Sequence, residues 1–283
     1  MTFVDSARYT AAVKGSVPMP YSLIACDYDL TLTRSDRKVS MHTRDTIRAV
    51  FTAGKYVTLA SGRLGESADV AKPLFPADVP LILGNGAAVQ SSATGKMLAE
   101  AVMDAENALT LLHWCRERGS AAIVYARSGI YADRFNRATE IYAERSSSEP
   151  RILTSPESAA QNGIYKVLLL GPAEPIAAAT CDLHAAPPCP LDCFRSGAEQ
   201  LEIVAPGVNK GMGLARAAAI LGIPQEETIA IGDGENDIAM LRWAGLGIAM
   251  ENAPDNVKAA ADVIAPVCDL DGAAWAMENY LLK

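Results

Sequence analysis

The sequence predicts an α/β fold with a doubly wound parallel sheet, covered by helices on both faces and interrupted by an inserted α+β domain. Two observations support this prediction. Short runs that are apolar at nearly every position recur near both ends of the chain, and segments with helical periodicity separate them. Strands that are apolar on both faces are typical of buried parallel sheets. The middle of the chain instead combines helices with hairpins.

The first part of the sheet is predicted from three apolar runs. Residues 21–26, 55–60 and 80–84 have the length and composition of buried strands. Between the first two, residues 40–54 have the apolar spacing of an amphipathic helix. Ser40 is suited to cap the start of this helix, because its side chain can accept a hydrogen bond from the first turn.

The same alternation returns in the last part of the chain. Residues 227–233, 246–250 and 261–265 are predicted strands. Residues 209–222 and 235–245 are predicted helices between them. Strand and helix therefore alternate at both ends, which predicts that the two ends form one parallel sheet.

The middle of the chain follows a different pattern. Residues 105–119 are a predicted helix, followed by a hairpin over residues 121–133. A strand over residues 164–171, a helix over 174–184 and a second hairpin over 193–205 complete this part. A helix followed by paired strands, twice, predicts a separate α+β domain.

These patterns divide the chain into three parts. Residues 1–19 are an N-terminal extension. Residues 20–86 and 195–283 form the predicted core, and residues 87–194 form the predicted insert.

Composition excludes several classes of partner. The chain has 283 residues, of which 50% are hydrophobic and 20% charged, so it can bury a full core. Its formal net charge is -8 and it has no basic run, which argues against nucleic acid and anionic membranes as partners. No segment has the pattern of a signal peptide or a bilayer span. We expect a cytoplasmic protein that is a monomer or a small homo-oligomer.

One group of cysteines leaves a metal site open as an alternative. Cys181, His184, Cys189 and Cys193 lie within one short segment and are nominally sufficient for zinc. Their spacing is irregular, and free cysteines often pack as small hydrophobic residues. The six cysteines of the chain include no C-x-x-C pair, so a reducing compartment fits best.

Polar residues follow four of the predicted strands at the point where each ends. A single pair such as Asp27 and Asp29 is most simply a solvated turn. Because parallel strands bring their carboxyl ends to one edge, residues that follow several strands should instead meet in one crevice. The residues at these strand ends are Asp27, Asp29, Ser61, Gly62, Arg63, Gly84, Asn85, Gly86, Asp233, Asn236 and Asp237.

Several carboxylates in one crevice need a compensating charge. At ~4 Å and an effective dielectric near 20, each like-charged pair costs about 4 kcal/mol. A divalent cation relieves this repulsion, and an all-oxygen site suits Mg²⁺. Lys210, at the start of a predicted helix, is suited to bind a phosphoryl group.

These motifs resemble those of the haloacid dehalogenase-like phosphohydrolases. The resemblance rests on "DYDLT", "SGR", "NK" before a helix and "GDGENDIAML", in this order. The segments "GNGA" and "LEIVAPGVNKG" are similar to those of the Cof-type branch, which carries a large α/β cap between the second and third motifs. The resemblance implies a Rossmann-like core for this chain and a cap in the middle.

The resemblance also implies roles for individual residues. Asp27 would be the nucleophile and Asp29 the general acid and base. The implied substrate-binding residues are Ser61, Gly62, Arg63, Lys210 and Asn236; the implied Mg²⁺ ligands are Asp27, the Asp29 backbone carbonyl and Asp233, supported by Asp237 and Asn209. The family usually has glycine where this chain has Leu30, which puts the local loop conformation in question.

We therefore expect a Mg²⁺-dependent phosphatase acting on small phosphorylated metabolites, above all sugar phosphates. The reaction would pass through an aspartyl-phosphate, which divides one difficult displacement into two. A phosphomutase or phosphotransferase with the same intermediate is the nearest alternative. A metabolite-binding module without catalysis belongs to a different class and stays open.

Overall fold

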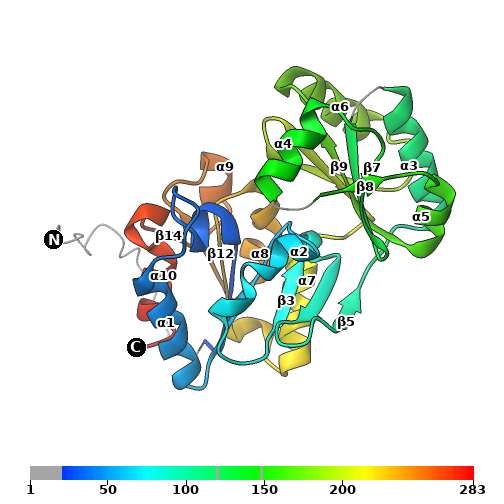
Figure 1. Ribbon diagram of the computed structural model, residues 1–283. Helices are drawn as coiled ribbons and strands as arrows, with labels where there is room; N and C mark the ends of the chain where they lie inside the picture. Colours follow the sequence, from blue (N-terminus) through cyan, green and yellow to red (C-terminus); the bar gives the residue numbers. More distant parts are fainter. Residues whose placement is uncertain (1–20, 119–120, 147–148) are drawn as a thin grey trace.

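The computed structural model describes residues 21–118, 121–146 and 149–283, which form the two-part molecule in Figure 1. The predicted extension, residues 1–19, lies outside this described part. The described residues form a five-stranded, a six-stranded and a three-stranded sheet. In Figure 1 the green elements of the middle of the chain lie above a core built from both ends.

The core sheet is parallel throughout, as predicted. Its strand order is β14-β13-β12-β1-β2, so the first strand of the chain lies inside the sheet and pairs with β12 and β2. The strands are β1 (Leu23–Cys26), β2 (Tyr56–Leu59), β12 (Thr228–Gly232), β13 (Leu246–Met250) and β14 (Val263–Ala265).

Helices cover both faces of this sheet, which confirms the doubly wound arrangement. Ile24 and Cys26 of β1 pack in the same cluster as residues of α1 and α10, whereas Leu23 and Ala25 pack with residues of α7, α8 and α9. This division follows from the alternation of side chains along a strand. The helices are α1 (Met41–Thr52), α7 (Lys210–Leu221), α8 (Ile238–Trp243), α9 (Asp255–Lys258) and α10 (Gly272–Tyr280).

The third predicted strand exists, but most of its pairing lies outside the parallel sheet. β3 (Pro80–Leu83) touches the parallel sheet through an isolated bridge between Ala60 and Ile82. Its full ladder is antiparallel, with β4 (Ala88–Ser91), which pairs in turn with β5 (Met97–Glu100). The chain reverses at Gly84, Asn85 and Gly86, which all have positive φ. Such a left-handed turn favours glycine and asparagine.

The inserted part forms a six-stranded sheet with the order β10-β11-β9-β6-β7-β8, antiparallel except between β7 and β8. Both predicted hairpins are present. The strands are β6 (Ala121–Ala126), β7 (Gly129–Ala132), β8 (Arg151–Ile152), β9 (Ile164–Leu170), β10 (Asp192–Gly197) and β11 (Gln200–Val204). The helices of this part are α3 (Ala105–Glu117), α4 (Arg137–Ser146), α5 (Pro156–Asn162) and α6 (Ala173–Ala185). The short helix α2 (Glu66–Asp69) belongs to the core.

The predicted boundaries at residues 87 and 194 stay a prediction. The sheets suggest a shift of both boundaries, because β4 and β5 pair with the core strand β3 whereas β10 and β11 pair with β9. We propose that the inserted unit extends from α3 to β11, and we call this unit the cap.

Helices α3, α5 and α6 cover one face of the cap sheet, whereas α4 lies at the opposite face, where Tyr142 hydrogen-bonds to Tyr125. Val124 and Val167 pack with residues of α3, α5 and α6, in a cluster separate from the core. Residues with the opposite orientation, such as Tyr125, Lys166 and Leu168, instead line a cavity shared with the core. This second face of the cap sheet, which we call the cavity face, therefore closes the cavity from the side opposite the core, together with α4. Among the described residues, no helix is long and apolar enough to cross a membrane.

Candidate active site

A cavity of about 800 Å³ lies between the carboxyl edge of the core sheet and the cavity face of the cap sheet. Most of the residues predicted from the strand ends line it. The core contributes Asp27, Asp29, Ser61, Gly62, Arg63, Asp233 and Asn236, and the cap contributes Tyr125, Tyr142, Lys166 and Glu202. The parallel topology thus brings residues from distant parts of the sequence to one place, as the sequence predicted.

Lys210 lies behind Asp27 and joins it to Asp237. Its side chain is fully buried, and Nζ lies 2.5 Å from Oδ1 of Asp27 and 2.5 Å from Oδ1 of Asp237. Lys210 is the first residue of α7, and Asn209 caps this helix by accepting a hydrogen bond of 2.9 Å from the Met212 amide. The predicted supporting role of Asn209 thus corresponds to a helix cap.

Gly86 allows the start of α7 to pack closely against the turn after β3. A Cβ atom at Gly86 would lie 2.1 Å from the carbonyl oxygen of Asn209, and the residue has a φ of +94°. Both the contact and the backbone conformation exclude a larger residue without movement. The turn after β3 therefore helps to place Lys210.

Burial and charge shift the pKa values of these groups. Burial raises the pKa of Asp27 well above its usual value; Lys210 opposes this, whereas Asp237 and Asp233 add to it. Burial lowers the pKa of Lys210, but Asp237 and Asp27 outweigh this effect and raise it overall. Burial, followed by repulsion from Asp237, raises the pKa of Asp233 to about 6, against a hydrogen bond from Thr31.

Three carboxylates in this site are close enough to share a metal ion. In the part of the chain that the structure describes, Asp27, Asp233 and Asp237 form the one group of three or more metal-binding side chains whose ligand atoms lie within 4.8 Å of one another. Lys210 offers one positive charge against three negative ones. This surplus and the all-oxygen donors fit a divalent cation such as Mg²⁺.

Asp237 is already engaged through both oxygens. Oδ1 contacts Lys210, and Oδ2 accepts hydrogen bonds of 3.0 and 2.9 Å from the amides of Asp233 and Gly234. Asp233 instead accepts a 2.9 Å hydrogen bond from Thr31 at Oδ1 and a 3.4 Å one from Asn252 at Oδ2. These contacts agree with a supporting role for Asp237 and leave Asp233 and Asp27 as the carboxylates better placed to bind a cation.

Asp29 is paired with Arg63 at the mouth of the cavity. The guanidinium donates two hydrogen bonds to the carboxylate, of 2.8 and 3.1 Å, and the Asp29 side chain is 51% exposed. Arg63 also lies over the ring of Tyr28, 5.1 Å from its centroid, and donates to the Ser67 carbonyl. Arg63 therefore orients the predicted acid and base in this structure, a contact that the sequence did not indicate.

Leu30 adopts the conformation expected of the glycine that it replaces. Its φ is +58° and ψ +14°, in the left-handed region. This conformation costs a residue with a Cβ atom about 1–2 kcal/mol. Hydrogen bonds hold the loop: the Leu30 amide donates to Thr33 and its carbonyl accepts from Asn252. The substitution therefore leaves the path of the loop compatible with the site.

Two charged residues of the cavity, Lys166 and Glu202 in the cap, were not predicted from the sequence. Lys166 and Glu202 form an ion pair of 2.6 Å whose side chains are 3% and 7% exposed. Asn85, predicted only as part of a strand end, donates a 2.7 Å hydrogen bond to Glu202. A signal was present, because each charged residue interrupts an otherwise apolar strand, "IYKVLLL" and "QLEIV".

The predicted zinc alternative finds no support in the described residues. Cys181 and His184 lie on α6, where Cys181 is exposed, and Cys193 lies in β10. The Cys189 thiol donates to the backbone carbonyl of Asn107 at 3.3 Å. None of these four residues belongs to the group of potential metal ligands described above.

Comparison with known proteins identifies the family. The family model of haloacid dehalogenase-like hydrolases matches residues 24–277. The chain is 28% identical to the Bacillus subtilis 5-amino-6-(5-phospho-D-ribitylamino)uracil phosphatase YitU, over 92% of this chain and 97% of that protein. A crystal structure of a haloacid dehalogenase-like hydrolase from Bacteroides thetaiotaomicron is 29% identical, with a TM-score of 0.78 over 92% of this chain and 99% of that one.

A local match has no bearing on activity. The chain is 49% identical over 82 residues to the chloroplastic endoribonuclease YBEY of Arabidopsis thaliana, but this match covers only 14% of that protein. The family model covers both the core and the cap, and relatives of full length agree with it. The chain therefore belongs to the haloacid dehalogenase-like hydrolases.

Proposed function

We propose that this hydrolase is a Mg²⁺-dependent phosphatase that cleaves small phosphorylated metabolites through an aspartyl-phosphate on Asp27. The main support is the position of Asp27, which lines the cavity while the buried Lys210 contacts it from behind. A carboxylate beside a fixed cation can approach a phosphate dianion that would otherwise repel it.

In the first step, a carboxylate oxygen of Asp27 forms a bond to phosphorus as the bond to the leaving oxygen breaks. Asp29 gives a proton to the departing alkoxide. In the second step, water attacks the phosphorus of the aspartyl-phosphate while Asp29 takes a proton from it. The bond between phosphorus and Asp27 then breaks, which releases phosphate and restores the carboxylate.

Other residues bind and orient. Ser61 is nearly fully buried at the end of β2 and lines the cavity, so its hydroxyl can donate to a phosphoryl oxygen. Lys210 neutralises part of the charge at the nucleophile. Mg²⁺, held by Asp27, Asp233 and the Asp29 carbonyl, would supply further positive charge for the phosphoryl oxygens.

The cavity suits a leaving group larger than the phosphate itself. Its cap side offers hydroxyl and charged groups from Tyr142, Lys166 and Glu202 beside the apolar Leu168 and Leu170. Such a lining fits the hydroxyl groups and carbon chain of a sugar or polyol phosphate. The substrate named for YitU combines a phosphorylated ribityl chain with a uracil ring, so it belongs among the candidates beside sugar phosphates.

The test is a screen of the purified protein with Mg²⁺ against sugar phosphates, polyol phosphates and 5-amino-6-(5-phospho-D-ribitylamino)uracil. In every positive reaction we expect water to accept the phosphoryl group, so that inorganic phosphate is released. Transfer of the phosphoryl group to a second sugar would instead show a phosphotransferase. The cytoplasmic location and the monomeric or small homo-oligomeric state stay predictions.

Asp27→Asn is the matched control, since it keeps the shape of the side chain but removes the nucleophile. We expect no turnover of any ester by this variant. Activity within about tenfold of the wild type would contradict the role of Asp27.

A further inference from the structure

The cap contains a buried ion pair, Lys166 with Glu202, that is not part of the proposed catalytic steps. Lys166 in β9 and Glu202 in β11 both lie on the cavity face of the cap sheet, 2.6 Å apart and almost without exposure. Burying two charges brings a desolvation penalty that can exceed their attraction, so a buried pair is weak grounds for a purely stabilising role.

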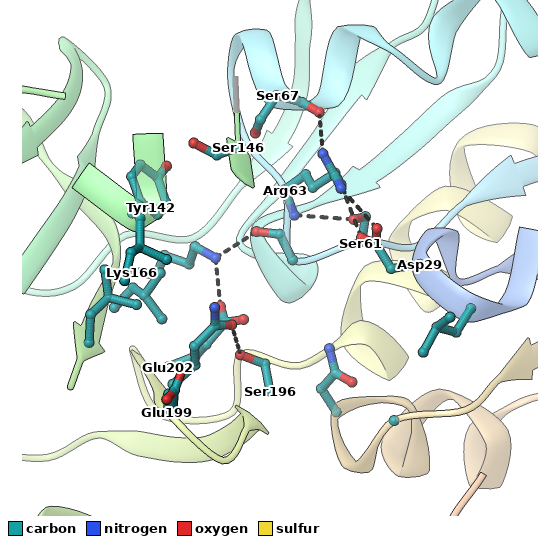
Figure 2. A pocket seen from close by; sticks show the side chains of 18 of the residues that line it. Asp29, Ser61, Arg63, Ser67, Tyr142, Ser146, Lys166, Ser196, Glu199 and Glu202 are labelled. Atoms are coloured by element: carbon teal, nitrogen blue, oxygen red, sulfur yellow. Dashed lines mark hydrogen bonds and ion pairs between the residues drawn. The ribbon is translucent and has the colours of Figure 1, made fainter. Parts of the chain in front are cut away.

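Both charges also bind the core, and Figure 2 shows Lys166 and Glu202 joined to each other at the side of the cavity. Nζ of Lys166 donates a 2.6 Å hydrogen bond to the carbonyl of Gly62, the residue after Ser61. Oε2 of Glu202 accepts a 2.7 Å hydrogen bond from Nδ2 of Asn85. Glu202 approaches so closely that a Cβ atom at Gly62 would lie 3.1 Å from its Oε1. The pair thus contacts the core beside the predicted phosphoryl site.

The chain of hydrogen bonds has a defined direction. A carboxylate paired with lysine can only accept, so Asn85 must turn its amide nitrogen toward Glu202. The carbonyl oxygen of Asn85 then faces the other way, where it accepts a 3.0 Å hydrogen bond from Nδ2 of Asn236. Asn85 is fully buried with a φ of +58°, so it has little freedom to turn. The negative charge of Glu202 therefore sets the orientation of the Asn85 amide and, through it, that of the Asn236 amide.

We propose that Lys166, Glu202 and Asn85 are positioning residues that link the placement of the cap to phosphate binding. They orient Asn236 and hold the backbone of Gly62 beside Ser61. This inference rests on the proposed function only in that Asn236 and Ser61 contact the phosphoryl group. Its consequence is that the site binds phosphate well only while the cap is docked on the core.

The experiment replaces the pair by apolar residues of similar size, Lys166→Met/Glu202→Leu. No unpaired charge remains, and such replacements of buried ion pairs are often neutral or stabilising, but the Asn85 amide and the Gly62 carbonyl lose their partners. We therefore expect a folded variant with a Tm close to that of the wild type. Binding of inorganic phosphate in the presence of Mg²⁺, measured by calorimetry, should nevertheless weaken about 10- to 100-fold. The reason is that Asn236 and Ser61 would no longer be held in the position from which they contact the phosphate. The kcat/KM for p-nitrophenyl phosphate should fall alongside.

Glu174→Gln is the matched control. Glu174 is an exposed carboxylate in the first turn of α6, which packs on the opposite face of the cap sheet. This variant should bind inorganic phosphate as the wild type does. Equal phosphate binding by the wild type and Lys166→Met/Glu202→Leu would overturn the inference and leave the pair a structural feature of the cap.

A thermodynamic cycle tests whether the pair acts through Asn236. In an Asn236→Ala background, adding Lys166→Met/Glu202→Leu should weaken phosphate binding further by less than the same change does in the wild type, since coupled residues are not additive. Fully additive losses would overturn the route through Asn236.

The outcomes separate this inference from the proposed function. A wild type that binds phosphate through Asn236 but hydrolyses no ester would refute the phosphatase and leave the positioning role intact. If the wild type hydrolyses esters and Lys166→Met/Glu202→Leu binds phosphate as well as the wild type does, the phosphatase stands and the positioning role is refuted. Failure of the wild type to bind inorganic phosphate would overturn the positioning role, and failure to hydrolyse any ester as well would overturn both.

Discussion

Lys210→Met should destabilise the metal-free protein, because it leaves two carboxylates in the core without their cation. Lys210 is fully buried and contacts both Asp27 and Asp237 at 2.5 Å. Methionine fills nearly the same space as the lysine stem, so the change removes the charge and leaves little cavity. Breaking a buried ion pair by removing one partner costs about 3–5 kcal/mol. We expect a loss of this size in the free energy of unfolding at pH 8.

The loss should be smaller at low pH. Burial already raises the pKa of Asp27, and without Lys210 the pKa would rise further. A carboxyl group whose pKa is higher in the folded than in the unfolded state favours folding as it takes up a proton. The destabilisation should therefore shrink between pH 8 and pH 5, as Asp27 binds its proton in the folded variant.

Urea unfolding in the presence of a chelator, followed by circular dichroism at both pH values, measures this effect. Lys96→Met, at an exposed lysine in the turn before β5, is the control and should unfold like the wild type. Lys210→Met/Asp237→Asn should recover part of the loss, since it removes one of the two unpaired charges. A Lys210→Met variant within about 1 kcal/mol of the wild type at both pH values would refute the neutralising role of Lys210.

Three further predictions concern the acid, the metal site and the turn after β3. Asp29→Asn should slow the hydrolysis of sugar phosphates about 10²–10⁴-fold; p-nitrophenyl phosphate should show a burst of nitrophenol and then slow turnover, and equal losses without a burst would exclude Asp29 as the acid. Mg²⁺ affinity, measured by calorimetry, should fall below about pH 6, because protons compete for Asp233, whose pKa is raised to about 6; constant affinity between pH 5 and pH 8 would contradict this. Gly86→Ala should lower the Tm far more than Gly54→Ala, because both glycines have positive φ but only the first would place a Cβ atom 2.1 Å from the Asn209 carbonyl; similar losses would show that strain alone matters.

The core sheet and most of the residues at its edge follow from local patterns in the sequence. The runs that became β1, β12 and β13 are buried at every position, so their apolar composition was a sufficient signal. Because these strands are parallel, the residues that follow them must meet, which is sufficient to bring Asp27 and Asp233 together. The position of Lys210 at the start of a helix was likewise predicted from "NK", whereas its burial and the hydrogen bond by which Asn209 caps α7 were not.

The contacts between distant segments are visible only in the folded molecule. The ion pair of Asp29 with Arg63 and that of Lys166 with Glu202 join residues 34 and 36 positions apart, and Asn85 meets Glu202 across 117 positions. No local pattern encodes such partners, because they depend on how loops and strands pack within each part of the molecule and, for Asn85 with Glu202, on how the cap docks on the core. The antiparallel pairing of β3 was missed for a related reason: the positive φ values at Gly84, Asn85 and Gly86 reverse the chain, and a strand's own residues do not specify its neighbour. Local periodicity therefore specifies the helices and strands and the sheet edge where the strands end, whereas tertiary packing, within each part and between them, specifies which charged groups meet at the site.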